Sequence, residues 1–88
     1  MSGPSTSYVP FDELIVSLRA DGLGSQADLL HYLIYKVAWT TGSELIGELG
    51  QEMKKLEQEH RAMFSTGTAA KLDIAFDVVR RVWPDFPR

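Results

Sequence analysis

The sequence contains no cysteine, which excludes disulfide bonds, thiolate metal sites and cysteine nucleophiles. It also has no run approaching the roughly 18 apolar residues that a transmembrane helix requires. The first ten residues, MSGPSTSYVP, lack the basic and apolar regions of a secretion signal. From these absences we expect a cytoplasmic protein that has no membrane partner.

Basic residues are in the minority, because nine Lys and Arg face twelve Asp and Glu, for a formal net charge of −3. Such a balance provides no global attraction to nucleic acid or to anionic lipid, so nucleic acid is not expected as a partner. The hydrophobic fraction of 44% is that of a folded globular chain. At this length, one core can remove roughly 60–65% of the unfolded surface from water, so we expect a single domain.

Motifs for nucleophilic catalysis and phosphate binding are also missing. The sequence has no G-x-S-x-G, and the GLGS segment at residues 22–25 lacks the lysine of a P-loop. Ser25, Ser43 and Ser65 stand where helix caps are expected. We therefore predict neither enzymatic activity nor a cofactor.

Apolar spacing predicts four helices, at about residues 10–20, 25–40, 43–64 and 69–83. The first carries apolar residues at i, i+3, i+4 and i+7, beginning at Phe11, and the third repeats its apolar positions every seven residues. The predicted fold is a compact all-α four-helix domain with a short apolar central helix and a C-terminal antiparallel helical hairpin. Residues 1–9 are predicted to be a flexible tail and residues 10–88 a single helical domain.

The second of these helices is the predicted central helix. Its most apolar stretch, residues 28–39 (DLLHYLIYKVAW), has two different faces. On a helical wheel the aliphatic residues form one stripe, which we expect to be the core: Leu30, Leu33, Ile34, Val37 and Ala38. The aromatic and polar residues lie on the other side, which we expect to be a contact surface: Asp28, His31, Tyr32, Tyr35, Lys36 and Trp39. Ile74 and Val78 on the fourth helix are further apolar positions in excess of one core.

Helix ends are marked by capping residues and glycines. Ser25 is predicted to cap the second helix, and Thr41 with Glu44 has the T-x-x-E spacing of a capping box. Thr66 or Thr68 can cap the fourth helix. Gly22 provides a left-handed residue to end the first helix.

Other residues in the predicted helices and turns carry expectations of their own. Leu23 is expected to fold back onto the apolar face of the first helix, and Phe86 to tuck back after the fourth. Gly47 and Gly50, inside the third helix, either admit a close neighbour or mark a kink.

A carboxylate three residues before a histidine occurs twice, at Asp28 with His31 and at Glu57 with His60. Pairs with this spacing hold di-iron and di-manganese centres in helical bundles. Folding the chain back near Thr41 leaves His60 about 12 Å beyond His31 at 1.5 Å per residue. A helical-bundle metal protein is therefore kept only as a second alternative, and no metal ligand is assigned.

The segment TSYVP, a short amphipathic helix and then GLGSQADLL resembles the outline of ribbon-helix-helix repressors over residues 6–39. That resemblance implies a DNA-binding transcriptional regulator whose paired strands enter the major groove. It assigns the reading of bases either to Thr6 and Tyr8, or to Ser5, Ser7 and Val9. None of these is basic, and Gln26 stands where the family more usually has a basic residue. DNA binding is therefore the first alternative.

The preferred hypothesis is a non-catalytic protein that interacts with or regulates another macromolecule through a helical apolar and aromatic face. Tyrosine and tryptophan are tolerated at partly solvent-exposed positions and contribute strongly to the binding energy of interfaces. The expected partner is a second copy of the chain, another protein, or both. The predicted face comprises the six aromatic and polar residues of the central helix named above.

Overall fold

The computed structural model describes residues 8–39 and 41–88. Its elements are α1 (Val9–Ala20), α2 (Gly24–Tyr35), α3 (Gly42–His60), a 3₁₀ turn η1 (Arg61–Met63) and α4 (Thr66–Val82). No strand occurs in the described part of the chain. The all-α class with four compactly packed helices is confirmed.

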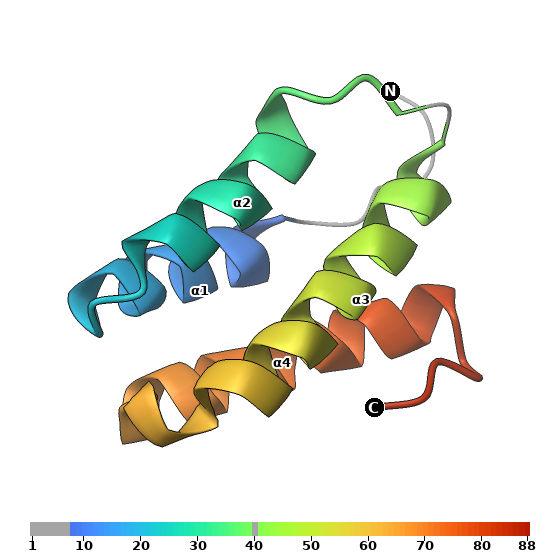
Figure 1. The fold of residues 1–88 in the computed structure, drawn as a ribbon. Helices are drawn as coiled ribbons and strands as arrows, with labels where there is room; N and C mark the ends of the chain where they lie inside the picture. The colour runs from blue at the N-terminus through green and yellow to red at the C-terminus, as the bar shows by residue number, and fades with distance from the viewer. Residues whose placement is uncertain (1–7, 40) are drawn as a thin grey trace.

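The four helices form a closed arrangement in which each packs against two others. α1 contacts α2 and α4, and α3 contacts the same two helices from the other side. Successive helices run in opposite directions, and η1 joins α3 to α4 as an antiparallel pair (Figure 1). The radius of gyration, 12.5 Å, is close to the roughly 12 Å expected of a compact chain of this length.

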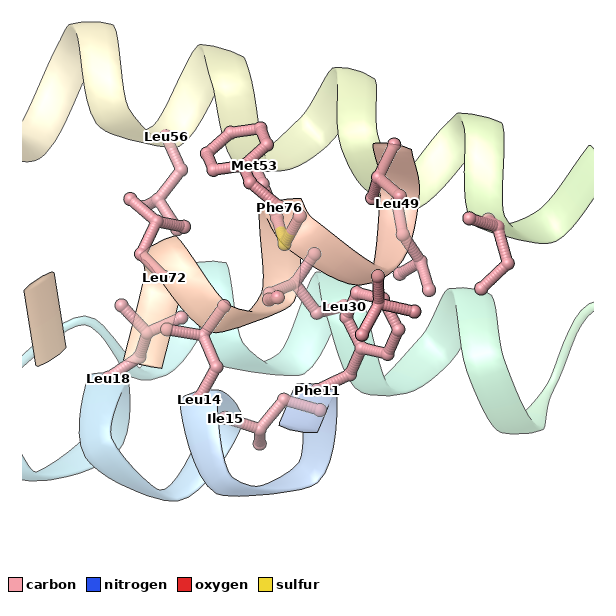
Figure 2. Packing of buried hydrophobic residues seen from close by; sticks show 14 of the residues in the cluster. Phe11, Leu14, Ile15, Leu18, Leu30, Leu49, Met53, Leu56, Leu72 and Phe76 are labelled. Carbon is pink, nitrogen blue, oxygen red and sulfur yellow. The ribbon is translucent and has the colours of Figure 1, made fainter. Parts of the chain in front are cut away.

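The core is built mainly from α1, α3 and α4. In Figure 2, side chains of α4 such as Leu72 and Phe76 lie between those of α1 and α3. The most deeply buried large side chains are Phe11, Leu14, Leu18, Leu30, Ile46, Leu49, Met53, Leu72, Phe76 and Val79. Each apolar stripe meets two neighbouring helices, which is how a chain of this size encloses one core.

The expectation that the second helix is central is wrong. Only Ala27 and Leu30 of α2 are buried. Leu33, Ile34 and Val37 of the predicted stripe are half-buried, and Ala38 is exposed. In the closed arrangement, α2 and α4 lie opposite each other, and the side chains that fill the space between α1 and α3 come mainly from α4, so most of the surface of α2 faces water.

α2 is also shorter than predicted, because it ends at Tyr35 rather than at residue 39 or 40. The chain then turns, and the Trp39 indole N–H donates to the Leu33 carbonyl oxygen at 2.6 Å. That carbonyl is one of those left without a helical partner at a helix end. Ser25 is not the cap: Leu23 occupies the N-cap position with no side-chain hydrogen bond.

Other predicted ends and turns are confirmed. Thr41 and Glu44 form the reciprocal capping box of α3. Gly22 ends α1 with a φ of 83°, and Leu23 is buried. Of the residues expected to cap α4, Ser65 does so and Thr66 and Thr68 do not, because the hydroxyl of Ser65 accepts from the Thr68 N–H at 3.2 Å.

The helical domain begins before residue 10. α1 starts at Val9, and Tyr8 packs against the core. The strand implied by the ribbon-helix-helix resemblance is therefore wrong at these two positions, since Tyr8 has φ −95° and ψ 2° and Val9 is helical. The strand positions at Ser5, Thr6 and Ser7, and the rest of the predicted tail, lie outside the described residues.

The seven-residue repeat of α3 is confirmed over its first two heptads, in which Ile46, Leu49, Met53 and Leu56 are buried. It fails at the end of the helix. His60 is half-buried, and Met63 is 49% exposed because α3 stops at His60 and the chain turns into η1.

Candidate interaction surfaces

The exposed side of α2 is tied to α1 by two polar contacts. The Tyr35 hydroxyl donates to the Asp12 carboxylate at 2.8 Å and 3.0 Å. Closer to the turn that joins the two helices, Arg19 and Asp28 form an ion pair at 2.6 Å. Both contacts are exposed, so each stabilises the pair only slightly. The hydrogen bond to Asp12 also raises the pKa of the Tyr35 phenol above its ordinary value.

Apolar and aromatic groups lie between these two contacts. Asp12, Val16 and Arg19 follow at i, i+4 and i+7, so they share the side of α1 that faces α2. Val16 is 67% exposed. On α2 the ring of His31 lies 4.8 Å from the ring of Tyr35.

Two further exposed residues of this side of α2 are Tyr32, which is 55% exposed, and Lys36 at the C-cap. We call the surface formed by Val16, Asp28, His31, Tyr32, Tyr35 and Lys36 the tyrosine face. It holds five of the six residues predicted for the contact surface. Val16 was not predicted to belong to this surface. The only sign of it in the sequence is an isolated apolar residue on the solvent-exposed side of α1.

Trp39 does not belong to this face. The early end of α2 sends it to a different part of the molecule, where it lines a groove of about 570 Å³. The other walls are one side of α3 and residues 83–87, which follow α4. We call this site the tryptophan groove, because it contains both tryptophans of the sequence, Trp39 and Trp83.

Two glycines of α3 let the segment after α4 lie close to the helix. A Cβ on Gly47 would stand 3.2 Å from the Trp83 indole nitrogen, and one on Gly50 would stand 2.9 Å from the Phe86 ring and from Val79. Phe86 is buried there, as predicted. Of the two roles the sequence left open for these glycines, close approach is therefore the observed one.

Trp83, the residue at which the fourth helix was predicted to end, is 45% exposed. Its indole N–H donates to the Ser43 carbonyl oxygen at 2.8 Å. Val78, expected to be surplus, is buried, whereas Ile74 is 53% exposed.

Arg88 fixes the far end of the same segment. Its guanidinium lies 4.3 Å from the centre of the Phe76 ring and pairs with Glu57 of α3 and Asp73 of α4. Partial burial opposes the charged form, but the hydrogen bonds from Arg88 to Asp73 and Glu57 outweigh it and raise the pKa of Arg88. The segment is thus held at both ends.

A cluster of hydroxyl groups and one carboxylate joins the end of α1 to the start of α4. The buried hydroxyl of Thr68 lies 2.6 Å from that of Ser17 and accepts from Ser65 at 3.0 Å. Hydrogen bonds from Thr68 and from the Ser65 backbone N–H lower the pKa of Asp21. Every member caps or joins a helix end, so we assign this cluster a structural role.

The two histidines are not brought together. The ring of His31 contacts that of Tyr35 at an interplanar angle of 43°, whereas Nε2 of His60 lies 3.2 Å from the side-chain nitrogen of Gln26, beside a hollow of about 160 Å³ between α2 and α3. The described residues contain no group of three or more side chains placed to hold a metal ion. Within the same residues, no helix has the length and apolar character to cross a membrane.

No protein-family model matches the chain, and comparisons with curated proteins and with solved structures gave no significant match.

Proposed function

We propose that this chain is a non-catalytic protein-interaction domain that associates with a second copy of itself through the tyrosine face. The observation that carries the proposal is the exposure of Tyr32 and Val16, which remain more than half exposed beside a complete core. Tyrosine is enriched at the centres of interfaces, where its ring is buried and its hydroxyl finds a partner.

The charges of the face favour a second copy as the occupant. In a two-fold dimer the same patch meets itself, so a face of one sign would repel its copy. Here Asp28 carries negative charge in the second turn of α2 and Lys36 carries positive charge at its C-cap, with Arg19 beside Asp28. An antiparallel pairing of two α2 helices would bring Asp28 of one copy toward Lys36 of the other.

Light scattering coupled to size-exclusion chromatography tests this proposal through Tyr32→Ser. Tyr32 is preferable to Tyr35 because Tyr35 also bonds to α1. We expect the unaltered chain to have twice the mass of a single chain and the variant to have the mass of one. Circular dichroism of the variant should keep its helical signal, because Tyr32 contributes little to the core.

Ile74→Ser is the matched control, because Ile74 is 53% exposed on α4, outside the tyrosine face. It should leave the dimer intact. A single-chain mass for the unaltered protein at millimolar concentration would overturn the proposal, and so would a dimer that survives Tyr32→Ser.

A further inference from the structure

The tryptophan groove is lined by two indole rings whose N–H groups already have acceptors. An indole has one N–H group. That of Trp83 already donates to Ser43, and that of Trp39 to Leu33. These bonds also hold the two rings in position before any ligand arrives, which lowers the entropic cost of binding.

Among the described residues, every charged side chain that lines the groove is acidic. Glu44 and Glu48 lie one turn apart on α3, and Asp85 faces them from the segment after α4. Glu44 also accepts from the Thr41 N–H at 3.4 Å, and Glu48 and Asp85 are exposed. The adjacent cations Arg80 and Arg81 do not line the groove.

The size of the groove sets the scale of the ligand. About 570 Å³ lies within the range of roughly 300–1,000 Å³ typical of sites for small molecules. It exceeds the volume of one side chain, so the space suits a short stretch of polypeptide rather than a single residue.

We propose that the tryptophan groove binds an arginine-bearing segment of a partner protein. A guanidinium is planar, carries five donors and no acceptor, stacks on aromatic faces and pairs with carboxylates. These properties complement two indole rings held in place by hydrogen bonds and a wall that carries three carboxylates. The carboxylates would repel phosphate and acidic peptides. The proposal is independent of self-association, because the groove shares no residue with the tyrosine face.

Tryptophan fluorescence measures this binding directly, because both tryptophans of the chain line the groove. The 88-residue chain is titrated with a tetra-arginine peptide, and in parallel with tetra-lysine and tetra-citrulline. Citrulline has the shape of arginine without the charge. We expect a saturable change with arginine, weaker binding of lysine and none of citrulline. Added salt should weaken the arginine complex.

Glu48→Gln tests the acidic wall, and Glu13→Gln is its matched control on α1, since both side chains are exposed. Glu48→Gln should weaken tetra-arginine binding roughly 2- to 5-fold, the range for an exposed ion pair. Glu13→Gln should leave it unchanged. The proposal is overturned if citrulline binds as tightly as arginine, if both variants weaken binding equally, or if arginine leaves the fluorescence unchanged.

Discussion

Among the glycines that the structure describes, Gly50 is the one at which a side chain has least room. A methyl group there would stand 2.9 Å from both Phe86 and Val79. Overpacking of a core costs about 1–3 kcal/mol, whereas alanine gains up to about 1 kcal/mol of helix propensity over glycine. We expect Gly50→Ala to lower the free energy of unfolding by roughly 1–2 kcal/mol in urea titrations.

Gly24→Ala is the control for that experiment, because nothing lies within 4 Å of a Cβ at the start of α2. It should be neutral or slightly stabilising. Equal effects of the two substitutions would contradict the close packing of Phe86 on α3. Gly47→Ala, by contrast, should change the tryptophan emission, because its neighbour is the Trp83 indole.

Asp21 links stability to pH. Its pKa is lowered from 3.8 in the folded chain by hydrogen bonds from Thr68 and from the Ser65 N–H. A carboxylate with a depressed folded pKa stabilises the fold above its unfolded pKa, and the contribution is lost as the pH falls through the folded value. Urea titrations should therefore show Asp21→Asn to be less stable than the unaltered chain at pH 7, with the difference shrinking below pH 3.8.

Asp77→Asn accompanies that measurement, because it removes an exposed carboxylate from the middle of α4 and not from a helix end. If Asp21→Asn and Asp77→Asn lose stability alike at neutral pH, the cluster that joins α1 to α4 has no special stabilising role.

Among the elements, α1 and the first part of α3 could be predicted well and α2 poorly. The apolar repeat of α3 and the Thr41–Glu44 pair are local signals, and both appear in the fold. The end of α2 depends in part on a residue far along the sequence. Trp39 lies outside the helix, where its indole N–H donates to the Leu33 carbonyl oxygen and its ring lines a groove with Trp83. Helical periodicity continues through residue 39 and gives no sign of this.

Capping distinguishes the two helix starts experimentally. Thr41→Ala removes an observed cap of α3 and should cost about 1 kcal/mol. Ser25→Ala should change the free energy of unfolding by less than about 0.5 kcal/mol, because Ser25 is exposed and makes no cap in α2. Urea titrations measure both values. A loss at Ser25 as large as that at Thr41 would restore the capping role that the sequence suggested.

At the scale of the molecule, the two proposed surfaces differ in how far the sequence could predict them. Most of the tyrosine face lies on one helix, so the wheel of residues 28–39 located it. The tryptophan groove combines Trp39, one side of α3 and residues 83–87. Each part taken alone is typical of a core or a helix end, and only the glycine pair in α3 indicated a close neighbour.

Thermal unfolding can separate the two surfaces, because any binding that requires the folded state stabilises it by mass action. If the tyrosine face forms a dimer, the melting temperature should rise with protein concentration, and Tyr32→Ser should abolish that dependence. Tetra-arginine should raise the melting temperature of Tyr32→Ser as well, since a ligand at 100 times its Kd adds about 2.7 kcal/mol. Glu48→Gln should reverse the pattern, with the concentration dependence kept and the response to peptide reduced. A variant that lost both responses would indicate one shared surface instead of two.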